Sequence, residues 1–173
     1  MIFKYIRNKI NPPTKVVNTS KYWPYIFHLN KQVSIDESFG LLIKQSVVKL
    51  PKYVTPVAFA TWTINNDADE FEEIILSDKS YKFLYDPTND ILYLLQLSDI
   101  SKREDINLPN IVVDGIEYEQ VTDVIEVDNE NRLIRIYERE LTQDNNEYLF
   151  LETDSKMLQK TWIGVTIETS AIR

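Results

Sequence analysis

Short runs of β-branched and aromatic residues recur along most of this chain, each followed by turn-forming residues. Runs of about four to eight such residues, bounded by Gly, Pro, Asn, Asp or Ser, are typical of β-strands. The short turns between the runs indicate an antiparallel series. In the first two thirds of the chain, the expected strands are 43–50, 54–64, 73–76, 81–85 and 91–97.

The C-terminal third shows the strand pattern most clearly. Asp114-Gly115 separates two short apolar runs, and it is a hairpin signal because glycine supplies the positive φ of a tight turn. In the last run, Ile163, Val165 and Ile167 recur at every second position, which is the period expected when one face of a strand is buried. We expect a β-meander of four strands at 121–127, 132–141, 147–152 and 160–168.

Size and composition support one β-rich domain. The chain has 173 residues, of which 43% are hydrophobic and 12% aromatic. This length is sufficient for one core and short for two domains, and aromatic and β-branched side chains favour pleated, half-buried surfaces. We therefore expect a β-rich α+β fold of antiparallel sheets, with residues 1–20 as a basic N-terminal arm and residues 21–173 as a single domain.

The chain lacks the residues that most enzyme motifs require. It has no cysteine, which excludes disulfides, thiolate metal sites and a cysteine nucleophile. Its three glycines lie too far apart for a phosphate-binding loop. His28 is the only histidine, and no serine lies in a nucleophile elbow. We therefore expect a non-enzyme without catalytic, cofactor-binding or metal-binding residues. An enzyme built from Asp, Glu, Tyr and Lys is the alternative.

Two groups of acidic residues could be taken for chemical sites. Residues 67–73 contain five Asp and Glu, but no glycine supplies the sharp turn of a calcium-binding loop, so we expect a solvated loop. Glu138 and Glu140 share one face of an expected strand, as the paired carboxylates of a glycosidase could. Arginines at 132, 135 and 139 intervene and indicate a ladder of opposite charges on an exposed strand instead.

The first ten residues form a candidate surface anchor. Apolar residues recur there at helical spacing, with Lys4, Arg7 and Lys9 between them, and Pro12-Pro13 ends the pattern. This pattern predicts a short basic amphipathic helix or arm that makes weak peripheral contact with a membrane. Packing of the apolar residues on the domain is the alternative.

An aromatic segment at Tyr22–Phe27 is the second candidate surface. Aromatic side chains often anchor a protein partner, because they bury a large area at a low entropic cost. Trp23, Tyr25 and Phe27 are therefore candidate partner-binding residues. Coverage of one edge of the core is the alternative, because Pro24 is typical of an edge strand or an extended segment.

Charge is distributed unevenly along the chain. Residues 1–60 carry nine Lys and Arg against two acids, and residues 61–173 carry ten against twenty-five, so a net charge of +7 is followed by one of −15. An acidic chain is a poor general nucleic-acid binder, because affinity for phosphates comes from Lys and Arg. We expect a protein partner and no nucleic acid. Acidic residues that only solvate the surface are the alternative.

Several segments resemble one known family. Phe39–Ile43, Val47–Leu50, Ile136–Leu141, Glu147–Leu151 and Ile163–Ile167 are similar to segments of the YjfK-like family of uncharacterised bacterial proteins, and the resemblance spans roughly residues 38–173. It implies a cytoplasmic bacterial protein of unknown activity, similar to proteins encoded near a phage-shock-type coiled-coil protein and a small membrane protein. It supplies no catalytic residues.

We therefore expect a non-catalytic accessory or adaptor protein that binds a protein partner near the inner membrane. A cytoplasmic location fits the lack of cysteine and of a segment with about 18 apolar residues. One alternative is a small acidic inhibitor or immunity protein that neutralises a basic toxin or nuclease, since opposite charge accelerates association. Another is an unrecognised enzyme or small-ligand binder.

Overall fold

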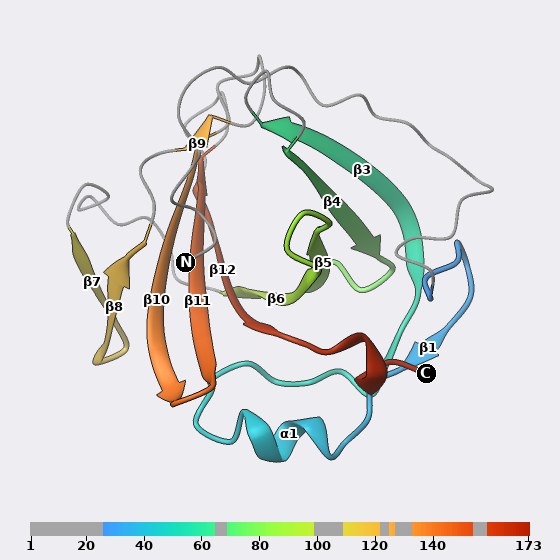
Figure 1. Cartoon of the computed structure of the whole chain (residues 1–173), viewed down its shortest axis with the longest axis horizontal. Coiled ribbons are helices and arrows are strands. Elements are labelled where there is room, and N and C mark those ends of the chain that lie inside the picture. The colour runs from blue at the N-terminus through green and yellow to red at the C-terminus, as the bar shows by residue number, and fades with distance from the viewer. Residues whose placement is uncertain (1–25, 65–68, 99–108, 122–124, 127–132, 154–158) are drawn as a thin grey trace.

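One antiparallel sheet of ten strands forms the body of the protein (Figure 1). The computed structural model describes residues 26–64, 69–98, 109–121, 125–126, 133–153 and 159–173. The strand order is β3-β4-β5-β6-β12-β11-β10-β8-β7, and β9 pairs with β10 beside this path. The strands are β3 (Pro56–Ile64), β4 (Asp69–Leu76), β5 (Tyr81–Asp86), β6 (Ile91–Ser98), β7 (Asn110–Val113), β8 (Ile116–Gln120), β9 (Ile125–Glu126), β10 (Leu133–Thr142), β11 (Asn145–Thr153) and β12 (Gln159–Thr166).

The remaining elements are small. Strands β1 (Val33–Ser34) and β2 (Tyr53–Val54) form a separate antiparallel pair, helix α1 (Phe39–Leu42) lies between them in the sequence, and the 3-10 helix η1 (Thr169–Ala171) follows β12. The described C-terminal segment returns to this region, because Arg173 N–H donates to the Ser34 carbonyl at 2.9 Å. The N-terminal part of the domain is thereby fixed to the end of the chain.

The predicted fold class and the C-terminal meander are confirmed. Strands β10, β11 and β12 follow one another as antiparallel neighbours, with one register shift between Glu140 and Thr142 of β10. The hairpin between β7 and β8 turns at Asp114 (φ 51°) and Gly115 (φ 79°), so both turn residues have the positive φ that this kind of tight turn requires. Local sequence signals therefore determine this half of the sheet.

The sheet has two buried faces. The first face carries the larger core, in which strand residues such as Phe83 and Leu149 pack with the N-terminal residues Phe27, Phe39 and Val48. The second face carries a smaller core of nine buried residues, which are Phe71, Leu84, Tyr93, Leu95, Ile134, Ile136, Tyr148, Phe150 and Trp162. Burial on both faces explains why most of β6 and the middle of β11, residues 148–151, are apolar.

The sheet is strongly curled. Figure 1 shows β3 and β4 on one side, β10 and β11 on the other, and β6 and β12 between them. In a flat sheet, β5 and β11 would lie about 14 Å apart, because two strands separate them and neighbouring strands are about 4.8 Å apart. Lys82 of β5 nevertheless forms an ion pair with Glu152 of β11. The second face is therefore concave between these two strands.

Two predictions from the sequence are wrong. The expected strand at 43–50 instead begins at Ile43, the C-cap of α1, and consists of turns and irregular chain, although Ile43 and Val48 are buried as strand residues would be. The acidic stretch expected as a solvated loop is largely part of β4, which begins at Asp69. Glu72 of this strand is buried and accepts a 2.6 Å hydrogen bond from the Thr61 hydroxyl of β3. Glu72 is therefore a buried, hydrogen-bonded residue of the sheet and not part of a solvated loop.

Other predictions fall outside the described residues. The basic arm with Lys4, Arg7 and Lys9 and most of the aromatic segment lie there. The proposed boundary at residue 20 lies there as well.

Gly164 offers a test of packing inside the sheet. A Cβ atom at this position of β12 would lie 2.8 Å from the Leu94 carbonyl oxygen and would also clash with the Leu95 side chain. We expect Gly164→Ala to lower the free energy of unfolding by about 1–3 kcal/mol, because the neighbouring backbone must move. Gly40→Ala in α1 is the matched control, since its Cβ would meet only Leu50 Cδ1, at an ordinary 3.6 Å. Equal urea midpoints for the two variants would contradict this account.

Candidate functional site

Residues 38–50, which we call the strap, cross the first face of the sheet. The strap begins with α1 and continues as turns and irregular chain. Phe39, Ile43 and Val48 are buried and belong to the larger core. Phe39 and Ile43 are four residues apart, which places both on the same side of a helical turn. The strap is therefore held to the sheet by apolar side chains at both of its ends.

Glu147 of β11 fixes the middle of the strap. Its side chain is fully buried, and one carboxylate oxygen accepts hydrogen bonds from the Tyr118 hydroxyl and from Arg139 Nε–H, both at 2.6 Å. The other oxygen accepts the Val47 backbone N–H at 2.8 Å and the Ser46 hydroxyl. Arg139 also donates to the Gln45 carbonyl at 2.9 Å. We call Glu147, Arg139, Tyr118 and Ser46 the carboxylate clamp.

The hydrogen bonds of the clamp fix the protonation states of Glu147 and Tyr118. Burial alone would raise the pKa of Glu147, but the hydrogen bonds from Arg139, Ser46, Tyr118 and Val47 outweigh it and hold the pKa below its ordinary value. Burial and the hydrogen bond to Glu147 raise the pKa of Tyr118. Glu147 is thus a stable anion and Tyr118 a stable neutral donor. A carboxylate held in this way is a poor general base.

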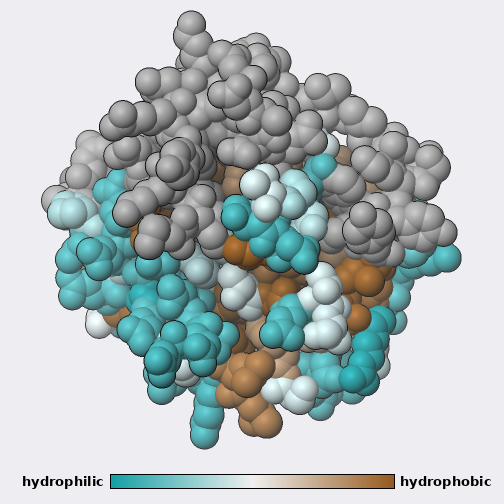
Figure 2. All heavy atoms as spheres, in the orientation of Figure 1, coloured by the Kyte–Doolittle hydropathy of each residue, from teal (hydrophilic) through white to brown (hydrophobic). Residues whose placement is uncertain are grey.

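The strap exposes apolar side chains on its outer side, and we call Leu41, Leu42 and Val47 the apolar platform. Their residue surfaces are 77%, 55% and 43% exposed. Figure 2 shows hydrophobic atoms at the lower edge of the molecule, where Figure 1 places α1. Lys44 and Lys49, also exposed, lie beside these residues in the sequence. The platform is small, and the clamp fixes the backbone of one of its residues, Val47.

A second charged cluster lies on the second face, and we call Lys82, Glu73 and Glu152 the charged triad. Lys82 Nζ lies 3.2 Å from Glu73 Oε1 and forms a hydrogen-bonded ion pair with Glu152. The lysine side chain is 5% exposed and the two glutamates are 14% and 10% exposed. Lys82 Nζ also lies 4.3 Å from the centroid of the Trp162 ring, within the range of a cation–π contact. The triad connects three separate strands across the curl.

Aromatic rings fill the same face beyond the triad. Tyr93 meets Tyr148 and Phe150 edge to face, with ring centroids 5.2 and 5.8 Å apart. The Tyr93 hydroxyl and Trp162 Nε1–H are buried without a hydrogen-bond partner. Two unsatisfied polar groups on one face are unusual, because each costs free energy.

Of the candidate partner-binding residues, only Phe27 is described. Its side chain is fully buried, and its ring centroid lies 4.8 Å from that of Phe83. Phe27 therefore belongs to the core and is not exposed to a partner, as the alternative interpretation of the aromatic segment expected. Trp23, Tyr25, Lys4, Arg7 and Lys9 lie outside the described residues.

The structure also corrects the predicted charge ladder on β10. Residues alternate between the two faces of a strand, so Glu138 and Glu140 share one face while Arg135 and Arg139 turn to the other. Arg139 binds Glu147 in the clamp. The arginine at 139 therefore does not neutralise its neighbours in the sequence.

The described residues form no group of three or more His, Cys, Asp or Glu placed to hold a metal ion. No helix in the described ranges is long and apolar enough to cross a bilayer. No protein-family model, curated protein or solved structure matches this chain. The candidate site is therefore interpreted from its own chemistry. It consists of buried glutamates held by fixed hydrogen-bond donors, and of an apolar platform that one of them, Glu147, binds at Val47.

Sequence reasoning missed the clamp and the platform. Ser46 and Glu147 are 101 positions apart, and Val47 and Glu147 are 100 apart. Neither residue type is unusual in its local sequence. The apolar run at 41–48 was a visible signal, but its pattern also fits a buried strand.

Proposed function

We propose that this chain is a non-catalytic accessory or adaptor protein and that it binds a protein partner through the apolar platform. One observation carries the proposal: Leu41 and Leu42 are exposed on a strap that is held by the buried side chains of Phe39 and Ile43 and, at Val47, by a buried carboxylate. A fixed surface loses little entropy when a partner binds, so apolar side chains presented on it favour association. Exposed leucines on a mobile loop would not carry the same argument.

A place near the bacterial inner membrane belongs to the same proposal. It is supported by the resemblance to the YjfK-like family and by the basic pattern of the first ten residues. The platform adds apolar side chains next to Lys44 and Lys49, a combination that also occurs on proteins that touch anionic membranes.

The test compares three tagged chains expressed in the native host. These are the full chain, the platform variant Leu41→Ser/Leu42→Ser, and the control Val57→Ser, which changes an exposed valine of β3. We expect one stoichiometric protein to be captured by the full chain and by the control, and to be lost from the platform variant. Chemical cross-links from Lys44 or Lys49 to that protein would locate the contact.

Two other outcomes overturn the proposal. Equal capture by all three chains would show that the partner binds elsewhere. If no stoichiometric protein is captured, but the full chain cosediments with phosphatidylglycerol vesicles and the platform variant does not, the platform contacts lipid and not protein. A chain lacking residues 1–11 separates the contribution of the arm from that of the platform.

A further inference from the structure

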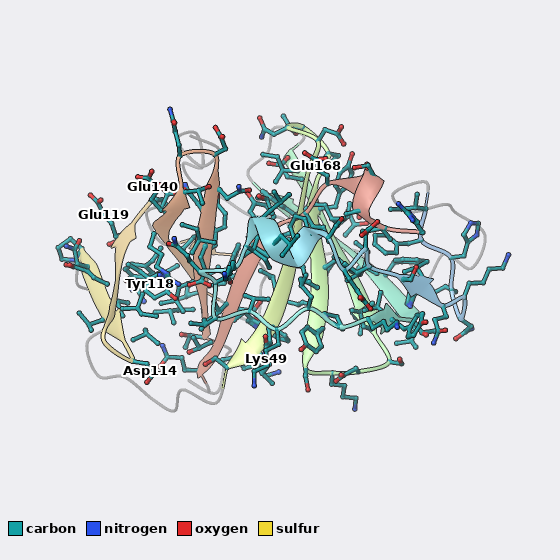
Figure 3. The ribbon with its side chains drawn as sticks, turned by 90° about the horizontal axis from the view of Figure 1, so that it is seen from below. Lys49, Asp114, Tyr118, Glu119, Glu140 and Glu168 are labelled. Carbon is teal, nitrogen blue, oxygen red and sulfur yellow. The ribbon has the colours of Figure 1, made fainter. Side chains whose placement is uncertain are left out.

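Side chains of the sheet bind the backbone of the strap at every second residue from 45 to 49. Figure 3, seen from below, shows α1 at the start of the strap in front of the strands. The three contacts are the Gln45 carbonyl with Arg139 at 2.9 Å, the Val47 N–H with Glu147 at 2.8 Å, and the Lys49 N–H with Gln96 Oε1 at 2.7 Å. We call Arg139, Glu147 and Gln96 the backbone anchors. Each lies at least 47 positions from the group that it binds, so the sheet holds this part of the strap as it would hold a separate peptide.

Apolar residues of β12 lie between two of the anchors. Gln96 of β6 pairs with Ile163, and Glu147 of β11 pairs with Val165. Cross-strand partners share one side of a sheet, so Ile163 and Val165 lie on the first face beneath the strap. Both belong to the larger core, together with Val48 of the strap. We call the anchors with Ile163 and Val165 the strap site, because it combines apolar contacts with hydrogen-bond partners for a backbone.

The two ends of the strap are joined by a base that does not depend on the strap site. Strands β1 and β2 pair at Val33 and Val54, and the Ile35 N–H donates to the Lys52 carbonyl at 3.1 Å. Ile35 also forms a β-bridge with Ile172 near the end of the chain. A loop that is closed at its base can leave a surface while the elements before and after it stay in place. Local openings of this kind require less free energy than global unfolding.

The anchors select a segment by its backbone more than they stabilise the fold. Glu147 and Arg139 form a buried ion pair, and such a pair adds little net stability compared with apolar side chains of similar size. The ionised Glu147 accepts hydrogen bonds and donates none, whereas Arg139 only donates. A segment in this site must therefore present an N–H to the first and a carbonyl to the second. Main-chain hydrogen bonds combined with side-chain contacts are the usual means of peptide recognition.

We propose that the strap site is a peptide-binding site, which the strap fills from within the same chain, and that a segment of a partner protein exchanges with the strap. The Ser46 hydroxyl donates to Glu147, and Val48 is buried. The partner segment therefore carries a hydroxyl residue and, two positions later, an apolar residue. A lipid chain would contact the apolar residues but would give Glu147 no N–H donor.

This inference goes beyond the proposed function, because the apolar platform is on the outer side of the strap and the strap site is on its inner side. The attached strap competes at an effective concentration in the millimolar range, so exchange takes place from a minor open state. Exchange would also withdraw the platform from the surface of the sheet. One partner could thereby regulate the binding of another.

The first measurement is the opening of the strap. The chain has no cysteine, so Val48→Cys gives it one thiol, which is buried in the closed state. We expect iodoacetate to modify this thiol under native conditions at least about tenfold faster than the thiol of Leu95→Cys, because local opening of the strap exposes only the first. Leu95 is buried on the second face of β6. Equal rates by mass spectrometry would mean that both thiols react only after unfolding, and would overturn the inference.

The second measurement is the binding of a peptide to the open site. The carboxymethyl group on the Val48→Cys chain keeps the strap out, because its charge is disfavoured in an apolar core. The probe is a fluorescein-labelled peptide with the sequence of residues 43–50. We expect it to bind the carboxymethylated chain and not the unmodified one. The same peptide with Val48→Asp should bind at least about tenfold more weakly, since a buried valine is replaced by a charge.

Three outcomes of this assay overturn the inference: no binding to the carboxymethylated chain, equal binding of the two peptides, and equal binding to the modified and unmodified chains. Circular dichroism follows the sheet during modification, and its loss would show that the strap cannot leave separately, which also overturns the inference. The platform variant Leu41→Ser/Leu42→Ser, combined with Val48→Cys, should react and bind the peptide normally. A failure of the platform and a failure of the strap site are therefore distinguishable.

Discussion

Replacing Glu147 by glutamine should lower the free energy of unfolding by about 3 kcal/mol, because removal of one partner from a buried charged pair leaves the other uncompensated. Glutamine keeps the size of the side chain and one acceptor oxygen, but it cannot neutralise Arg139 or accept all four hydrogen bonds of the clamp. Urea denaturation followed by circular dichroism measures the change. Glu140→Gln is the matched control, since the exposed Glu140 should change stability by less than about 0.5 kcal/mol.

The same variant should also release the strap. Amide hydrogen exchange at residues 45–48 should accelerate more in Glu147→Gln than exchange in the neighbouring strands β10 and β11, because Val47 N–H and the Gln45 carbonyl lose their fixed partners. Uniform acceleration over the whole chain would mean that Glu147 stabilises the sheet and not the strap in particular.

The clamp predicts a pH dependence with a definite sign. Because the folded pKa of Glu147 lies below its ordinary value of 4.5, its contribution is fully present above that value and is lost as the pH falls through the folded pKa. Wild-type stability should therefore decrease below about pH 4.5, and the decrease should be smaller in Glu147→Gln. Denaturation curves at several pH values between 7 and 3 measure both slopes. Parallel pH profiles would assign the acid sensitivity to other carboxylates.

Local sequence signals predicted most strands because the sheet is built from neighbouring hairpins. The Asp114-Gly115 turn and the alternation in β12 are local properties, and they gave the β7–β8 hairpin and the last strand of the meander. The strand prediction for residues 43–50 is wrong for a non-local reason. Their backbone is fixed by side chains of Glu147 and Gln96, which no pattern within the strap reveals.

The partners of the charged residues also could not be predicted from local sequence patterns. Glu72 and Glu73 looked like part of a solvated loop, yet each has a partner on another strand, Thr61 for the first and Lys82 for the second. The arginine at 139 seemed to neutralise Glu138 and Glu140, but strand alternation turns it to the other face. Charge patterns in a sequence therefore do not show which acidic residues have partners. Only the pairing of strands does.

A lysine buried between two glutamates gives the last prediction. Lys82→Met should lower the free energy of unfolding by about 3 kcal/mol, because Glu73 and Glu152 would face each other without their cation. The apolar methionine itself fits the site, which includes the Trp162 ring. The destabilisation should thus come from the two carboxylates that remain.

The triple variant Lys82→Met/Glu73→Gln/Glu152→Leu separates these causes. If the cost of Lys82→Met is that of uncompensated charge, removing both carboxylates should restore most of the lost stability, since replacing a complete buried ion cluster by apolar groups is often neutral. Urea denaturation of the single and triple variants measures the recovery. An additive loss would show instead that the triad fastens β4, β5 and β11 together through contacts that apolar side chains cannot replace. In that case the curl of the sheet, which brings Lys82 to Glu152, would depend on the ion pairs.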